Sequence, residues 1–179
     1  QKTAKELSHL HNGTGTVYVG GAVLGVPNTL RAKSGTTLAA GPSDILKLCE
    51  PIFKTYSARI IDLGEEAYKS NVMKICSNYL LTTTIQCIGE LYTFAEKSDL
   101  DLEYVHGLLH SVFANKSFLL YADKIKEQNF DQVNFSLDGG YKDVSLFGEA
   151  FNDVGVVPDL MSMIKNKFVA ARANGLNEK

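Results

Sequence analysis

The chain has 179 residues, 45% of them hydrophobic and 21% charged, and its formal net charge is −2. This length suffices for one well-packed core, or for one domain together with part of another. The sequence has no basic stripe and no apolar run of about 18 residues, which argues against nucleic acid and membranes as partners.

The cysteines and the N-terminus bear on the cellular compartment. Cys49, Cys76 and Cys87 are odd in number and lie within apolar patterns, which predicts buried free thiols in a reducing compartment. The first residues lack the apolar core of a signal peptide and an initiator methionine. We therefore expect a cytoplasmic protein, and a chain that is a piece of a longer one.

Strand and turn signals dominate the first 64 residues. The predicted elements are a strand over 16–19, a strand over 36–40, a helix from Ser43 and a strand over 58–63. A glycine-containing loop over 20–27 is expected between the first two strands. Strand, helix, strand is the order of an α/β layer, but so short a stretch cannot form a doubly wound sheet alone. We expect residues 1–64 to be the C-terminal part of a larger α/β domain.

The rest of the sequence is predicted to be helical. Residues 65–97 contain no proline and form one helix of about 50 Å, whose apolar residues cover more than one face and predict burial on several sides. Further helices are predicted over 101–113, 116–128, 139–154 and 158–173. Their start signals are Asp99 or Asp101, Asn115 and Asp138, and their stop signals are Gly155 and Gly175. The expected fold is mainly α: a short α/β remnant (1–64), then an all-α domain built on one long helix (65–179).

A polar stripe interrupts the apolar character of the long helix. Asn71, Lys74 and Asn78 are spaced i, i+3, i+7 and therefore share one face. A desolvated lysine has a lowered pKa and can move protons near neutral pH, while the amides can hold a substrate hydroxyl or carboxylate. The simpler interpretation is a lysine that reaches solvent from a helix edge, and the pattern alone leaves both open.

Three segments resemble the β-hydroxyacid dehydrogenases, the family of 3-hydroxyisobutyrate and 6-phosphogluconate dehydrogenases. Residues 64–78, GEEAYKSNVMKICSN, are similar to the turn and long helix that carry Lys and, four residues later, Asn in that family. Lys74 and Asn78 fall on these positions. Residues 17–27 resemble the family's substrate loop, and residues 140–144, GYKDV, resemble its Lys-Asp-Leu element.

The resemblance implies hydride transfer between NAD or NADP and a small hydroxy acid, semialdehyde or related carbonyl or imine. It implies a Rossmann-type domain that binds the dinucleotide and a homodimer formed through the long helix. The assigned residues are Lys74 as catalytic acid/base; Ala22, Val23, Leu24, Gly25 and Asn78 for the substrate; and Asn71 and Lys142 for the cofactor. Asp143 is expected to position the helix that carries Lys142.

The sequence also departs from the family pattern. The Gly-x-Gly-x-x-Gly phosphate loop is absent, so this piece is expected to be inactive alone. The usual Asp, Pro and Ser of the substrate loop are replaced by Gly20, Ala22 and Leu24, which leaves the substrate open. The alternative function is a non-catalytic helical module for dimerisation or interaction.

His106 and His110 are spaced i, i+4 on a predicted helix, as two metal ligands can be. The residues between them lack the glutamate of a zinc protease motif, and no third ligand is evident from the sequence. We therefore expect surface or packing histidines and no metal.

Overall fold

The computed structural model describes residues 1–113, 116–133, 135–155, 157 and 159–178. The chain divides into two compact units, an N-terminal unit (Gln1–Ser77) and a C-terminal unit (Asn78–Lys179). The last strand ends at Asp62 and the long helix begins at Tyr68, so the strands end well before the boundary between the two units. The proposed domain boundary at residue 64 stays a prediction.

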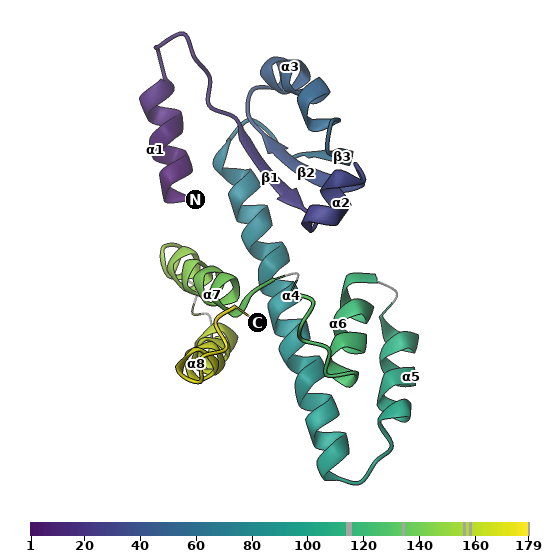
Figure 1. Ribbon diagram of the computed structural model, residues 1–179. Coiled ribbons are helices and arrows are strands. Elements are labelled where there is room, and N and C mark those ends of the chain that lie inside the picture. The colour runs from purple at the N-terminus through teal and green to yellow at the C-terminus, as the bar shows by residue number, and fades with distance from the viewer. Residues whose placement is uncertain (114–115, 134, 156, 158, 179) are drawn as a thin grey trace. The chain divides into compact units, whose positions relative to one another are not determined.

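The N-terminal unit is built on a three-stranded sheet (Figure 1). Its elements are α1 (Lys2–His11), β1 (Gly20–Leu24), α2 (Pro27–Arg31), β2 (Gly35–Ala40), α3 (Ser43–Phe53), β3 (Ser57–Asp62) and the first part of α4 (Tyr68–Lys97). The strand order is β1-β2-β3, with β1 antiparallel and β3 parallel to β2. Since α3 connects two parallel neighbours, β2-α3-β3 is a crossover unit of the kind found in α/β folds.

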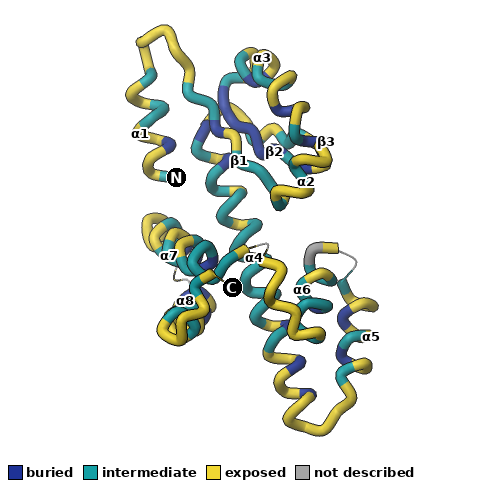
Figure 2. Tube along the Cα trace, in the orientation of Figure 1, coloured by how far each residue is buried: buried dark blue, intermediate teal, exposed yellow. Residues whose placement is uncertain are grey.

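The central strand β2 is the most buried part of this sheet (Figure 2). Leu38, Ala39 and Ala40 are at most 1% exposed, and Ala39 contacts Leu46 and Phe53 of α3 in one apolar cluster. The small alanines let the helix approach the strand closely. The buried hydroxyls of Thr37 and Ser57 satisfy each other at 2.8 Å and join β2 to β3.

The start of α4 is fixed by the ends of the strands. The amide of Leu63 donates to the carbonyl of Ala39, and the amide of Gly41 donates to the carbonyl of Gly64. Gly64 has a φ of +88°, which favours glycine, and its amide also bonds to Asp62. The turn that leads into α4 is therefore held to the carboxyl ends of β2 and β3.

The described residues of the C-terminal unit form helices joined by turns and loops, with no strand. It holds the rest of α4 with α5 (Leu102–Val112), α6 (Lys116–Lys126), α7 (Leu137–Asn152) and α8 (Asp159–Ala173). Its first cluster joins α4, α5 and α6 through Ile88, Tyr92, Ala95, Val105, Leu109 and Ala122. In α7 and α8, Val144, Phe147, Met161 and Ile164 are buried, and the two helices lie side by side (Figure 1).

Several predicted elements are confirmed, and others are wrong. The strands near 36–40 and 58–63, the helix from Ser43 and the long helix all form, and Gly155 and Gly175 have the positive φ of helix stops. The strand predicted at 16–19 lies instead at Gly20–Leu24, within the predicted loop, and α1 and α2 were not predicted. Asp101 caps α5, but Ser136, not Asp138, caps α7; Asn115 lies outside the described residues.

The expectation that the cysteines are buried is also wrong. Cys76 and Cys87 are exposed, and Cys49 is half-buried, although all three thiols are free as expected. The long helix exposes large apolar side chains of Met73, Leu80, Leu91 and Phe94, so in the single chain it is not buried on all sides. None of the helices in the described part of the chain combines the length and apolar character needed to cross a membrane.

Candidate functional site

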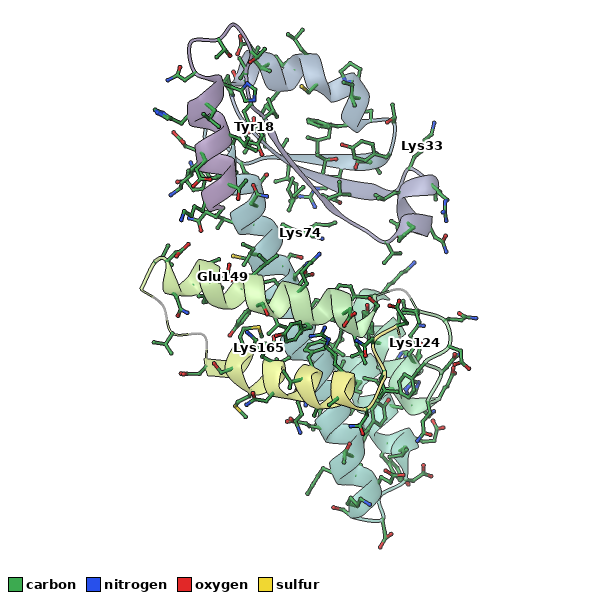
Figure 3. The ribbon with its side chains drawn as sticks, turned by 60° about the vertical axis from the view of Figure 1, so that its left-hand side comes forward. Tyr18, Lys33, Lys74, Lys124, Glu149 and Lys165 are labelled. Carbon is green, nitrogen blue, oxygen red and sulfur yellow. The ribbon has the colours of Figure 1, made fainter. Side chains whose placement is uncertain are left out.

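Lys74 lies on the first part of α4, where it contacts β1 (Figure 3). Its Nζ donates a hydrogen bond of 2.8 Å to the carbonyl oxygen of Val23, and the contact is partly buried. Lys74 and the segment predicted to bind substrate are thus brought together from 51 residues apart. The side chain of Lys74 is therefore directed to the main chain of β1 and does not simply extend into solvent.

The close approach of Gly20 explains why these two residues meet. A Cβ on Gly20 would lie 2.0 Å from the carbonyl oxygen of Ala67 and 2.5 Å from Oγ of Ser70. Val23 comes three residues after Gly20 on β1, a rise of about 10 Å. Lys74 comes one turn after Ser70 on α4, a rise of about 6 Å. The long side chain of Lys74 spans the remaining distance along the strand to Val23. The absence of a side chain at Gly20 therefore sets the position of Lys74 against the strand.

The predicted substrate segment is mostly strand. Ala22, Val23 and Leu24 are half-buried residues of β1, and Gly25 follows the strand with a φ of +152°. Because β1 is at the edge of the sheet, the carbonyls on its outer side have no strand to pair with. The main chain of Val23, rather than any side chain of this segment, makes the contact with Lys74, a role that residue identities alone do not reveal.

Asn78 is held by an acidic residue of α7. Its Nδ2 donates to Oδ2 of Asp143 at 3.1 Å, and Oδ1 of the same carboxylate lies 3.4 Å from Nζ of Lys142. A carboxylate only accepts hydrogen bonds, so this contact fixes the orientation of the Asn78 amide. The side chain of Asp143 is only 14% exposed, whereas that of Lys142 is 69% exposed. Asp143 therefore links Asn78 to an accessible cation, a link that sequence analysis did not foresee.

Two further polar residues lie on the same stretch of α4. Asn71 is half-buried, three residues before Lys74. Ser70 is 1% exposed, and its Oγ has no hydrogen-bond partner among the described residues. A buried hydroxyl without a partner costs free energy, on the order of 1–3 kcal/mol. Ser70 was not predicted as a site residue, and the small size it shares with Gly20 is the only sequence signal for its position.

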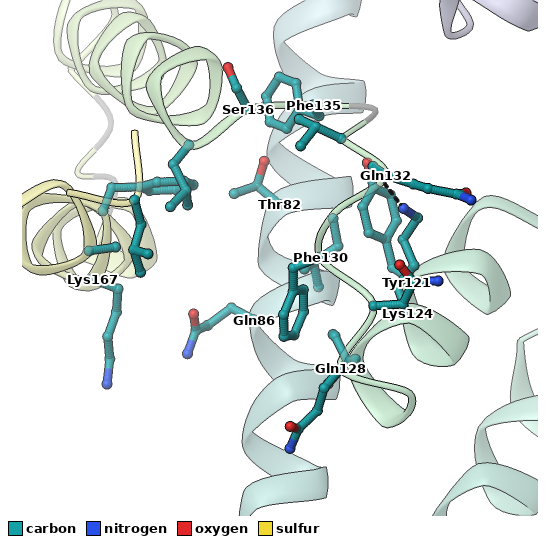
Figure 4. Close-up of a pocket in the computed structure, with 18 of the residues that line it drawn as sticks. Thr82, Gln86, Tyr121, Lys124, Gln128, Phe130, Gln132, Phe135, Ser136 and Lys167 are labelled. Atoms are coloured by element: carbon teal, nitrogen blue, oxygen red, sulfur yellow. Dashed lines mark hydrogen bonds between the residues drawn. The ribbon is translucent and has the colours of Figure 1, made fainter. Parts of the chain in front are cut away.

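One pocket lies elsewhere, within the C-terminal unit (Figure 4). Its volume is about 590 Å³, and Lys74, Asn78 and Lys142 do not line it. Its lining includes four aromatic residues, Tyr121, Phe130, Phe135 and Phe168, and Nζ of Lys124 is bonded to the carbonyl of Gln132. Burial raises the pKa of the Tyr121 phenol, which keeps it protonated. This lining suits an apolar occupant better than proton transfer.

The comparisons with known proteins agree with this architecture. Residues 69–179 match the family described as NAD-binding of NADP-dependent 3-hydroxyisobutyrate dehydrogenase. The chain is 25% identical to an oxidoreductase of Bacillus subtilis, YfjR, over 98% of the chain and 61% of the relative. It is 26% identical to the NADH-dependent oxidoreductase ucdB of Aspergillus ustus, over 67% of the chain and 40% of the relative.

The fold also matches a solved structure. A 3-hydroxyisobutyrate dehydrogenase from Salmonella typhimurium superposes with a TM-score of 0.84 at 15% identity, over 99% of this chain and 62% of the other. The chain thus spans about three fifths of the length of such proteins. Since the family match covers residues 69–179, well over half of the sequence, the chain belongs to the family of the NAD-binding domain of NADP-dependent 3-hydroxyisobutyrate dehydrogenase.

Proposed function

We propose that the protein containing this chain is an NAD(P)-dependent oxidoreductase that acts on a small hydroxy acid, semialdehyde or related carbonyl or imine. The observation that carries the proposal is the 2.8 Å hydrogen bond from Nζ of Lys74 to the carbonyl of Val23. It supports a lysine held in a partly buried place beside the segment expected to bind substrate. The family match at residues 69–179 supports the same class of reaction.

The proposed role of Lys74 is proton exchange with the substrate oxygen or nitrogen. A carbonyl oxygen such as that of Val23 accepts a hydrogen bond but takes no proton from an ammonium group. The contact therefore positions Nζ without discharging it. The amide of Asn78, oriented by Asp143, is proposed to hold the substrate in place.

The cofactor is proposed to be NAD or NADP, which supplies or accepts the hydride when bound. The donor set of this chain fits a dinucleotide, because the accessible ammonium of Lys142 suits anionic phosphate and the amide of Asn71 can bond to ribose or nicotinamide. The family description names NADP and one relative is NADH-dependent, so the choice between the two stays open to measurement.

A homodimer through the long helix is proposed as part of this function. Met73, Leu80, Cys87 and Phe94 recur every seven residues on α4, and all four are exposed. A strict seven-residue repeat places them along one side of a helix, with a drift of about 20° per repeat. Soluble proteins rarely leave such a stripe uncovered, which supports a helix–helix contact with a second copy.

The test is made on the whole protein with variants of Lys74. Nicotinamide oxidation or reduction is followed by absorbance against a panel of aldehydes, keto acids and imines, with NADH and NADPH. We expect Lys74→Ala to lose at least about a hundredfold in kcat, the scale of one acid/base group. Lys74→Arg keeps the charge but cannot release a proton at neutral pH, so we expect a comparable loss.

The matched control is Lys69→Ala, which removes an exposed lysine from the first turns of the same helix. Its turnover should stay near that of the wild type. Unchanged kcat in Lys74→Ala, or near-normal kcat in Lys74→Arg, would refute the acid/base role. A wild-type protein that turns over none of the panel with either cofactor would favour a non-catalytic dimerisation module instead.

A further inference from the structure

Three potential metal ligands meet between α5 and α6. His106 and His110 are one turn apart on α5, and Asp123 faces them from α6. Oδ1 of Asp123 lies 3.3 Å from Nε2 of His110 and 3.7 Å from Nε2 of His106. The ligand atoms of all three residues lie within 4.8 Å of one another. The third ligand that was not evident from the sequence is therefore present in the fold.

The distances suit ligands of a common ion better than direct ion pairs. Charge-assisted N–H···O bonds are usually about 2.7–2.9 Å long, shorter than both histidine–aspartate distances. Two ligands bound tetrahedrally to zinc at about 2.0–2.1 Å are separated by about 3.3–3.4 Å. The contacts of 3.3 and 3.7 Å are close to that separation. All three ligand atoms lie within 4.8 Å of one another, so the two imidazoles must move closer together to share an ion.

The phenol of Tyr92 on α4 orients one of the histidines. Its oxygen lies 3.1 Å from Nδ1 of His106, so Nδ1–H can donate to it while the lone pair of Nε2 points toward Asp123. Hydrogen bonds of this kind, from the second nitrogen of a metal-binding imidazole, fix its tautomer and direction.

We propose that His106, His110 and Asp123 form a binding site for a divalent transition metal of the zinc type that joins α5 to α6. Two imidazoles and one carboxylate select zinc and its neighbours over magnesium or calcium, which prefer oxygen ligands alone. His110 and Asp123 have side chains 40% and 43% exposed, so a solvent molecule can complete the tetrahedron and the ion can exchange.

Binding is expected to stabilise the helix pair. The ligands border the apolar cluster that contains Val105, Leu109 and Ala122, and Lys126 already pairs with Glu103 across the same two helices. An ion bound by the folded pair and less well by the unfolded chain raises the unfolding temperature by mass action.

The experiment is a titration of the purified chain, treated with EDTA and then freed of it, with ZnCl2, and with MgCl2 as the ionic control. We expect one zinc ion per chain by calorimetry and a rise in unfolding temperature that magnesium does not give. CoCl2 should give the visible absorption of a tetrahedral cobalt centre. His110→Gln and Asp123→Asn should each weaken zinc binding at least about tenfold.

The matched control is the double variant His9→Gln/His11→Gln, which removes the other two histidines of the chain, both on α1. It should bind zinc as the wild type does. Tyr92→Phe keeps the ring but removes the hydroxyl bonded to His106, and it should weaken binding about tenfold with little change in the unfolding temperature without metal. No zinc binding, or zinc binding that survives in His110→Gln but is lost in the α1 double variant, would overturn the site.

Discussion

At the scale of single residues, the side chains of the candidate site are held in place by neighbouring groups. Lys74 is held by a main-chain carbonyl and Asn78 by a carboxylate. The two contacts differ in whether a substitution can test them. The carbonyl of Val23 cannot be removed by changing a side chain, whereas the bond between Asn78 and Asp143 joins two side chains and can be reversed.

We expect Asn78→Asp to destabilise the C-terminal unit. The new carboxylate would face that of Asp143, which replaces a charge-assisted hydrogen bond worth about 1.5–3 kcal/mol with repulsion between like charges. Thermal unfolding followed by circular dichroism should show a fall of about 5 °C or more for a unit of this size. The double variant Asn78→Asp/Asp143→Asn restores a donor opposite an acceptor and should recover most of the loss. A double variant as unstable as the single one would contradict the assigned bond.

The part of the site that lies within one helix could be predicted from the sequence. Asn71, Lys74 and Asn78 share a face because of the helical period, and the structure places all three on α4. The contact with Val23 was expected only through family resemblance, because 51 residues separate the partners. Asp123 beside the two histidines had no sequence signal, since its approach depends on how α5 and α6 pack through Val105, Leu109 and Ala122.

At the scale of secondary structure, the spacing between β1 and α4 is predicted to depend on Gly20. Gly20→Ala should cost about 3 kcal/mol in unfolding free energy, because its Cβ would overlap the main chain of Ala67 at 2.0 Å and the backbone must move. Urea unfolding of Gly20→Ala and of the wild type measures the change in unfolding free energy. Gly21→Ala is the matched control, since its Cβ would lie 3.6 Å from the ring of Phe53, an ordinary contact. Equal effects of both substitutions would disprove the close approach as the cause.

The elements that the sequence predicted well are those with strong local signals. The strands β2 and β3 carry apolar and β-branched runs, and α4 has a long proline-free pattern. The position of β1 was wrong because Val17, Tyr18 and Val19 have higher strand propensity than Gly20–Leu24. Pairing with β2, in which Gly20 lies opposite Ala40, overrides that propensity. The helix α1 escaped prediction because it has few apolar residues and buries only Ala4.

At the scale of the whole molecule, the apolar stripe on α4 is the feature that a single chain leaves unexplained. Leu80 is 58% and Phe94 72% exposed, and with Met73 and Cys87 they form one stripe along the helix, not single exposed side chains. Covering these side chains with a second copy would remove their apolar surface from water, which favours association. The proposed dimer therefore predicts that the protein associates in solution and that substitutions in the stripe weaken this association.

Leu80→Glu and Phe94→Glu are each expected to convert a dimer to monomers. A carboxylate buried without a partner in the helix–helix contact costs about 3 kcal/mol or more, over a hundredfold in the dissociation constant. Sedimentation velocity across a range of protein concentrations measures the change. Glu96→Lys is the matched control: it alters charge on the same helix but points about 200° away from Phe94, so it should leave the dimer intact. A wild-type protein that sediments as a monomer at high concentration, or stripe variants that stay dimeric, would exclude α4 as the interface.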